Sequence, residues 1–210
     1  MSELIFEAIQ EGDSESLRSI LDRDPEAAGA TNDQGISAVM FAVYRGRADL
    51  AERIAAAKRE LTFFEACALG RTTEARRMLE DQPPCAEVSS PDGFTALHLA
   101  AYFGHSEIAR LLIAKGAAVN QAAENPSRVA PLHSAVAGRS IEVVRMLVEA
   151  GADLNARQKG GYTPLMGAAA NGQPVLVDYL LASGANPDAR SDDGKSARDL
   201  AIEKGFSDLF

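Results

Sequence analysis

Three histidines and two cysteines are the residues of this chain whose types could do chemistry. His98 and His105 lie seven positions apart in the stretch "DGFTALHLAAYFGH", and His133 follows 28 positions later. An imidazole can serve as a general base or a metal ligand, and a thiolate can attack an electrophilic carbon. Cys67 and Cys85 stand eighteen positions apart with no CxxC pair and no Cys/His cluster, a spacing typical of neither a disulfide framework nor a zinc site. The catalytic alternative that remains is a cysteine-dependent enzyme with a histidine base.

The segments around these residues repeat along the chain. Residues 93–120, 128–155 and 161–188 have the same length and the same order of small, apolar and glycine positions, and residues 194–206 repeat the first half. The front of the chain aligns with the middle in the same register. The turn position of successive units falls, in steps of 34, 24, 34, 35, 33 and 33 residues, at Gly12, Gly46, Gly70, Gly104, Arg139, Gly172 and Gly205.

This period predicts a solenoid of stacked units. Each unit reads as a helix, a tight turn, a second helix and a β-hairpin-like loop, so we expect an all-α fold. One helix pair cannot bury enough surface to offset its loss of backbone entropy, so neighbouring units must stack. The step of only 24 predicts that the hairpin between the second and third units is missing, which should leave a notch in the row of loops. We expect one domain over residues 1–210, with the terminal units as caps, divided approximately into units 1–34, 35–58, 59–91, 92–126, 127–159, 160–192 and 193–210.

Three stretches carry one pattern: "TALHLAAYFGH" at 95–105, "APLHSAVAGRS" at 130–140 and "TPLMGAAANGQ" at 163–173. Together with the endings "GAAVN" and "GADLN", this pattern resembles the ankyrin repeat family. The resemblance implies an ankyrin-repeat solenoid that binds another protein, without catalysis, through the concave surface formed by the hairpins and the first helices. Two departures from the pattern are notable, since Ala130 lacks the capping hydroxyl and Arg139 replaces the turn glycine.

The repeat gives the histidines a structural interpretation. The position of His98 is held in other units by aromatic, methionine and acidic side chains, and such a position is not a reaction centre. The resemblance implies that His98 forms hydrogen bonds near the helix start and ties adjacent units together. His105 lies in the turn after the first helix, and Thr163 with Pro164 forms a helix-start signal. We predict structural roles for these residues and for His133, and no metal site. The residues aligned with His98 are Phe6, Met40, Phe64, His133, Met166 and Asp199.

The resemblance also indicates which positions would contact a partner. These are the residues around each hairpin glycine and near the end of each first helix. Large aromatic side chains at such solvent-facing positions favour an interaction site, although the same rings could pack against the next hairpin. The loop at 121–129 is two residues longer than its counterparts and should project near this patch, so we expect the contiguous surface from the fourth unit onward. The predicted partner-binding residues are Phe94, Tyr102, Phe103, Tyr162, Asn171, Lys159, Tyr44 and Arg45.

The net charge narrows the class of partner. The chain of 210 residues carries 21 Lys and Arg against 30 Asp and Glu, a net charge of −9. A field of this sign repels phosphate backbones and acidic membrane surfaces, which argues against nucleic-acid and membrane binding. The acidic start "MSELIFEAIQEGD" lacks the features of a signal peptide, and no apolar run reaches the roughly 18 residues of a membrane span, so we expect a cytoplasmic protein.

The sequence thus predicts a non-catalytic protein–protein interaction module, monomeric and without a cofactor. A self-associating structural protein is the second interpretation, because the stretch "FSDLF" could leave apolar surface uncovered. The cysteine-dependent enzyme is the third.

Overall fold

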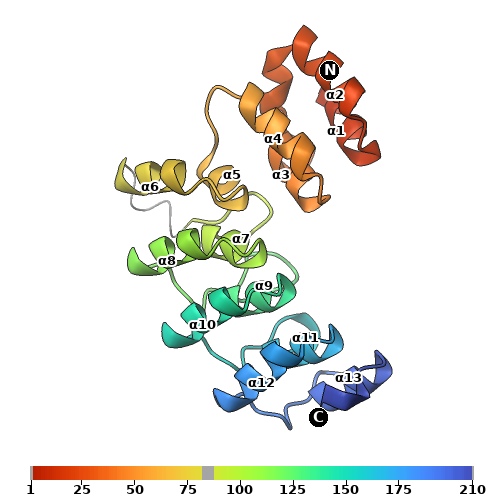
Figure 1. Cartoon of the computed structure of the whole chain (residues 1–210), viewed down its shortest axis with the longest axis vertical. Coiled ribbons are helices and arrows are strands. Elements are labelled where there is room, and N and C mark those ends of the chain that lie inside the picture. The colour runs from red at the N-terminus through yellow and green to blue at the C-terminus, as the bar shows by residue number, and fades with distance from the viewer. Residues whose placement is uncertain (1, 82–87, 210) are drawn as a thin grey trace.

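The computed structural model describes residues 2–81 and 88–209, and within these ranges the chain is helical with no extended strand. Figure 1 shows the helices stacked pair by pair along the long axis, with the termini at opposite ends. The predicted all-α solenoid is confirmed. No helix in the described ranges is long and apolar enough to cross a bilayer. The elements are α1 (Ser2–Glu11), α2 (Ser14–Arg23), η1 (Pro25–Gly29), α3 (Ala38–Tyr44), α4 (Ala48–Ala57), α5 (Phe63–Ala68), α6 (Thr72–Asp81), α7 (Ala96–Tyr102), α8 (Ser106–Ala114), α9 (Pro131–Ala137), α10 (Ile141–Glu149), η3 (Lys159–Gly161), α11 (Pro164–Ala170), α12 (Pro174–Ala182), α13 (Ala197–Glu203) and η4 (Ser207–Leu209).

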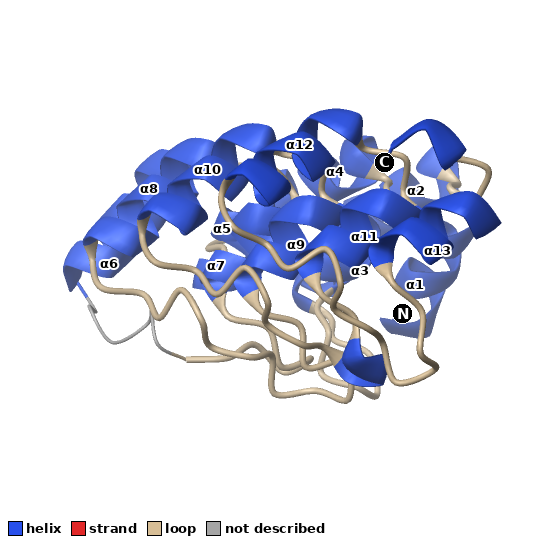
Figure 2. Cartoon of the chain, turned by 90° about the horizontal axis from the view of Figure 1, so that it is seen from below, coloured by secondary structure: helices blue, strands red, loops and turns tan. Residues whose placement is uncertain are grey.

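The two helices of each unit lie in two parallel rows. Figure 2 shows α6, α8, α10 and α12 in an outer row, α7, α9 and α11 in an inner row beside them, and the connecting loops in a third tier below. The loops are hairpin-like: Thr31 pairs with Ser37, and Ser89 pairs with Thr95, each through a single antiparallel bridge. The inner helices and the loops together form what we call the inner surface, where the partner-binding residues are predicted to lie.

The inner helices begin where side-chain oxygens satisfy the open N–H groups of the first turn. Thr95 accepts a hydrogen bond from the His98 amide at the start of α7, and Thr163 accepts one from Met166 at the start of α11. Pro164 follows at the first helical position, where its missing N–H costs nothing. The same kind of cap is supplied by Ser37, Thr62 and Ser196.

Small residues let the inner helices approach one another closely. In α7, Ala96, Ala100 and Ala101 are fully buried, on a helix that packs against both α5 and α9. Gly138, at the end of α9, takes this further, because a β-carbon there would lie 2.0 Å from the carbonyl oxygen of Tyr102. Gly138 therefore allows the end of α9 to lie directly against the end of α7, and a side chain at this position would push the two apart.

The hydrophobic core is divided in two between the second and third units. One core runs from α5 to α13, and a smaller one runs from α1 to α4. Figure 1 shows α1 to α4 displaced to one side of the remaining stack at this point. A small cluster centred on Met40 of α3, Ala68 of α5 and Leu99 of α7 joins the two cores. The helix α3 thereby reaches past the short α5 to contact α7.

A buried ion pair fastens the short connection between α4 and α5, where no hairpin is present. Lys58 Nζ lies 2.8 Å from Glu65 Oε1, and the side chains are 11 % and 0 % exposed. Glu65 also accepts hydrogen bonds from the Thr62 amide and the Ser37 hydroxyl. This one carboxylate therefore links the end of α4 to the starts of α5 and α3.

The sequence alignment of the third unit is wrong by one residue. Counting back from the turn at Gly70 places Phe64 in the position of His98. However, α5 begins one residue later than this count requires, and its third residue is Glu65. The Glu65 carboxylate accepts from the N-cap amide of Thr62, as the His98 ring does in α7. The reason is physical: the shortened connection leaves α5 one residue shorter than α7.

The notch expected from the missing hairpin is bridged at the loop tips. Pro91 packs against Gly35, whose β-carbon, if present, would lie 3.2 Å from the proline ring. Further along the row, the Lys159 amide donates to the Ser127 carbonyl oxygen at 2.9 Å. In the next pair of loops, the Asp192 amide donates to the Gly160 carbonyl oxygen at 2.9 Å. Pro91 holds the position of Lys159 and Asp192, two residues before the loop glycine, and has no N–H to donate. Below the tips a cavity of about 370 Å³ remains.

Candidate functional site

His98 and His133 use both ring nitrogens for hydrogen bonds. His98 Nδ1 accepts from the Thr95 amide at 3.2 Å, and its Nε2–H donates to the Val129 carbonyl oxygen at 2.9 Å. His133 repeats the arrangement, bonding to its own helix start and to the carbonyl oxygen of Tyr162. One accepting and one donating nitrogen require the neutral ring. Each histidine thereby ties the start of its helix to the next unit.

Burial keeps both rings neutral. Removal from water is the largest cause of the shift: it lowers the pKa of His98 to about 4 and lowers the pKa of His133 as well. The backbone carbonyls that accept from Nε2 oppose this shift without cancelling it. A ring that is neutral at pH 7 and uses both nitrogens within the fold has no lone pair for a substrate or a metal.

His105 and Arg139 connect neighbouring units through the turns. His105 Nε2–H donates to the Ala68 carbonyl oxygen at 2.9 Å, and its ring covers Gly70 of the preceding turn. Arg139, which replaces a turn glycine, has φ of 59°, a left-handed conformation that costs such a residue about 1–2 kcal/mol. Its guanidinium donates to the Asn171 carbonyl oxygen at 3.1 Å, which offsets part of this cost.

The structure describes only one of the two cysteines. Cys67 lies in α5 with no exposed surface, so a substrate could not reach its thiol without local opening. Cys85 lies outside the described residues. In the parts of the chain that the structure describes, no three His, Cys, Asp or Glu side chains gather as metal ligands would.

Two adjoining cavities open on the inner surface, and we call the pair the inner groove. The smaller, of about 170 Å³, lies between Tyr44 of α3 and Tyr102 of α7. The larger, of about 320 Å³, extends from Tyr102 across α9 to Asn171 at the end of α11. Phe94, Tyr102 and Ser134 line both cavities and so form the partition between them.

Four of the residues predicted to contact a partner line the inner groove: Tyr44, Phe94, Tyr102 and Asn171. Tyr102 is 49 % exposed and Tyr44 37 %, whereas Phe94 is half-buried. Because Tyr44 belongs to the second unit, the groove begins earlier along the chain than the fourth unit, where the sequence places its start. The cause is the missing hairpin, which lets α3 approach α7.

The other four predicted residues do not line the groove. Phe103 is half-buried and stacks on Tyr44, with ring centroids 6.3 Å apart. Tyr162 is partly buried against the core. The Arg45 guanidinium lies over the ring of a neighbouring phenylalanine, and Lys159 is exposed at the start of η3. These residues support or flank the groove, and their contact with a partner stays a prediction.

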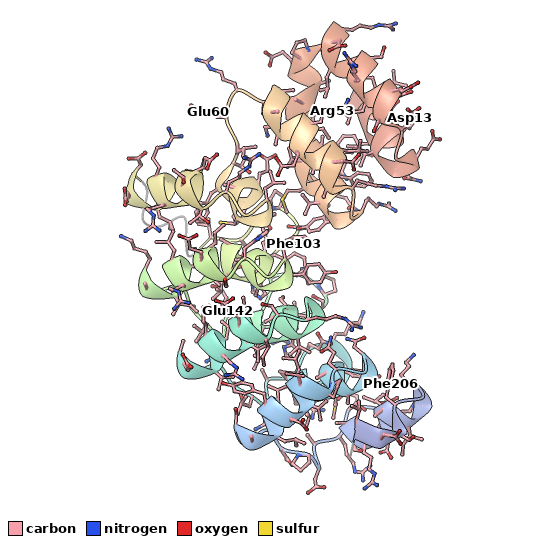
Figure 3. All side chains as sticks on the ribbon, viewed as in Figure 1. Asp13, Arg53, Glu60, Phe103, Glu142 and Phe206 are labelled. Atoms are coloured by element: carbon pink, nitrogen blue, oxygen red, sulfur yellow. The ribbon has the colours of Figure 1, made fainter. Side chains whose placement is uncertain are left out.

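Tyr44 is held in place at the boundary between the two cores. Its hydroxyl donates to Asp92 Oδ2 at 2.5 Å. Burial, and then the bond to Asp92, raise the pKa of Tyr44, so the phenol stays protonated and keeps donating. Figure 3 shows Phe103, the stacking partner of Tyr44, where α3 comes down onto α7. The smaller cavity therefore has a wall that is fixed from two units.

Ser134 and Gly167 are among the wall residues of the groove that the sequence prediction lacks. Both line the larger cavity, Ser134 from α9 and Gly167 from α11. Their small size leaves the volume open, whereas the prediction sought large aromatic side chains. The sequence does carry a signal for them. Ser134 and Gly167 each lie five residues before the turn position of their unit, so two successive units have a small residue at the same place in the repeat.

Models of known protein families match most of the chain. The model described as "Ankyrin repeats (3 copies)" matches residues 5–123 and 63–158. The chain belongs to the ankyrin repeat family. A second model, "Ankyrin repeats (many copies)", matches residues 147–201 of this ankyrin repeat protein. The matched ranges include every residue that lines the inner groove.

Curated ankyrin repeat relatives carry quite different names. Protein phosphatase 1 regulatory subunit 27 of Mus musculus is 44 % identical over 85 residues, which are 40 % of this chain and 54 % of the relative. The Homo sapiens protein of the same name is 41 % identical over 91 residues, 43 % of this chain and 58 % of the relative. A transient receptor potential cation channel subfamily A member 1 homolog of Caenorhabditis elegans is 32 % identical over 150 residues, 71 % of this chain and 12 % of the relative. The matched region thus spans little more than half of the phosphatase subunits and a small part of the channel.

Proposed function

We propose that this ankyrin repeat protein is a non-catalytic module that binds another protein through the inner groove, on the concave side formed by the hairpins and the first helices. The observation that carries the proposal is the groove itself: two adjoining cavities divided by Tyr102, an aromatic side chain that is half exposed. Exposed aromatic residues beside apolar cavities are typical of binding hot spots. The walls come from stacked helices and from loops that hydrogen bonds tie together, so the groove is preformed and little ordering accompanies binding.

The names of the relatives support binding rather than catalysis. Two relatives are named as regulatory subunits of protein phosphatase 1, and by analogy we infer that this chain also acts on a second protein. A third is named as a channel, so membership of the family does not fix the partner. We therefore propose that this chain binds a protein partner that differs from those of its relatives, and that it does so without a cofactor.

Capture of the partner from a lysate tests the proposal. The purified chain is immobilised, and the retained proteins are compared between the wild type, Tyr102→Ala and a matched control. The control is Val175→Ala, because Val175 is an apolar residue of α12 in the outer row that is 62 % exposed. Phe103 stays unchanged, since it is half-buried and its removal would disturb the fold.

We expect at least one protein that the wild type and Val175→Ala retain equally. Tyr102→Ala should retain about tenfold less of it, the effect of about 1.4 kcal/mol at a binding hot spot. Unchanged retention of every protein by Tyr102→Ala would count against the inner groove as the binding surface.

A further inference from the structure

We propose that the inner groove accepts an acidic segment of the partner, one that places two apolar side chains on either side of Tyr102 and carries Asp or Glu residues over α9 and α11. This inference rests on the proposed function, and it names the chemistry of the segment that the groove would bind.

The shape of the groove calls for two apolar side chains. The smaller cavity is walled by the rings of Tyr44, Phe94 and Tyr102, and the larger is lined by apolar residues that include Val136 and by the bare backbone of Gly167. Volumes of about 170 and 320 Å³ each hold a side chain the size of leucine or phenylalanine. Burial of one such side chain contributes about 1.5–3 kcal/mol. Because Tyr102 separates the cavities, the two side chains lie on opposite sides of its ring.

Three basic residues adjoin residues that line the larger cavity, although the chain as a whole is acidic. Arg128 is exposed and directly follows Ser127, which lines the cavity, and Lys159 is exposed and bonded through its amide to the same Ser127. At the opposite edge, the Arg139 guanidinium lies against the carbonyl of Asn171, another lining residue. In a chain with a net charge of −9, three basic residues that adjoin the lining of one cavity favour carboxylates on the partner and disfavour a basic segment.

The charges beside the smaller cavity are arranged differently. The carboxylate of Asp92 accepts a hydrogen bond from the hydroxyl of Tyr44, a residue that lines this cavity. Arg45 follows Tyr44 in the sequence, but its guanidinium lies over the ring of Phe41, which does not line the cavity. A carboxylate of the partner is therefore favoured over α9 and α11 and disfavoured over α7. This difference in charge sets the direction in which the segment lies along the groove.

Selection from a random dodecapeptide library displayed on phage tests the inference, with the full chain as target. A parallel selection uses Gly167→Leu, which fills the larger cavity. A β-carbon at Gly167 meets only the Val136 side chain, at 3.6 Å, and leucine is a better helix former than glycine, so this variant should fold. Circular dichroism checks that it does, and Tyr102→Ala is the second groove variant if it does not.

Enriched peptides are then synthesised and their Kd values measured with two double variants. Arg128→Glu/Lys159→Glu reverses the charge beside the larger cavity. Arg53→Glu/Lys115→Glu makes the same change of charge at two exposed positions away from the groove, Arg53 in α4 and Lys115 at the C-cap of α8, and Figure 3 labels Arg53.

We expect the enriched peptides to share two apolar residues and neighbouring Asp or Glu residues. Gly167→Leu and Arg128→Glu/Lys159→Glu should each raise their Kd about tenfold, while the outer-row control changes it less than about twofold. Raising the salt concentration from about 0.05 to 0.3 M should weaken binding, because it screens the attraction between exposed charges.

Enrichment of neutral or basic peptides, or a Kd that Arg128→Glu/Lys159→Glu leaves unchanged, would overturn the inference. So would an absence of enriched peptides, or peptides whose Kd neither Gly167→Leu nor Tyr102→Ala alters. The proposed function is tested separately, by capture from a lysate. It fails only if the Tyr102→Ala variant retains every partner that the wild type captures.

Discussion

At the scale of single residues, His98 shows how one ring can serve two units at once. Its Nδ1 accepts from the Thr95 amide while its Nε2–H donates to the Val129 carbonyl oxygen. Protonation would place a second N–H opposite the Thr95 amide and would bury a charge. The stability of the fold is therefore coupled to pH through this ring.

We expect the free energy of unfolding to fall between pH 6.5 and 4. An unfolded histidine has a pKa near 6.5, and burial lowers that of folded His98 to about 4, so in this window the unfolded state binds the proton and the folded state does not. The contribution is present in full above pH 6.5 and amounts to roughly 3 kcal/mol at most. Urea unfolding at several pH values measures the slope.

The control for this prediction is His98→Met, since Met166 holds the equivalent position in α11. The variant removes the titrating ring while the carboxylates stay in place, so its stability should depend less steeply on pH over the same range. Equal slopes for the wild type and His98→Met would show that His98 is not responsible.

Gly138→Ala should destabilise the fold because its methyl group would meet the Tyr102 carbonyl oxygen at 2.0 Å. We expect a loss of about 1–3 kcal/mol, the usual cost of overpacking. Gly167→Ala is the matched control, since its methyl group has room and alanine favours a helix by about 1 kcal/mol. Chemical denaturation of both variants gives the comparison, and a Gly138→Ala protein as stable as wild type would show that the two helix ends can separate at no cost.

Which residue details could be predicted depends on how local their causes are. The caps at Thr95 and Thr163 follow from neighbours within the same turn of helix, and the repeat alone indicated their positions. The open volume beside Ser134 and Gly167 depends on three stacked units and on what their side chains leave empty. A cavity of this kind cannot be predicted from the sequence of a single unit.

At the scale of the elements, α5 is the helix that the missing hairpin affects most. It has lost one residue relative to α7, and it holds a carboxylate, Glu65, with no exposed surface. The pair with Lys58 and the bonds to Ser37 and Thr62 satisfy that carboxylate. The turn glycines predicted the missing hairpin, but counting from them could not show that α5 begins later or that Glu65 is buried.

Glu65→Gln should cost about 3 kcal/mol or more, because it leaves the ammonium of Lys58 buried beside a neutral group. The double variant Lys58→Met/Glu65→Gln removes the stranded charge and should regain at least about 1 kcal/mol of that loss. Equilibrium unfolding of the two variants and of Lys58→Met completes a double-mutant cycle. A double variant that is no more stable than Glu65→Gln would mean that the pair contributes nothing as a pair.

At the scale of the whole molecule, the period of the sequence predicted the stack but not its division. The repeat predicted units stacked in one domain, whereas the described residues hold two hydrophobic cores, joined by a small cluster around Met40, Ala68 and Leu99. The division depends on how far α3 shifts when one loop is absent, which is a property of packing rather than of periodicity.

We expect α1 to α4 to open before the rest of the chain. In a repeat array, stability is the sum of the units and of the interfaces between neighbours, so a thin interface separates two cooperative regions. Amide hydrogen exchange should give α1 to α4 a common opening free energy below that of α7 to α11. Met40→Ala should widen the difference, and a single value for both regions would contradict the division.

The contact between Gly35 and Pro91 has a mechanical consequence. Later neighbouring loops in the row are joined by a backbone hydrogen bond. The loops that contain Gly35 and Pro91 meet through van der Waals contact, and the Tyr44 hydroxyl donates to Asp92 beside them. A pull on the two ends would load this joint as the weakest link, and it would part before the others. Tyr44 would then leave the smaller cavity while the larger one kept its walls, so tension alone would change what the protein can hold.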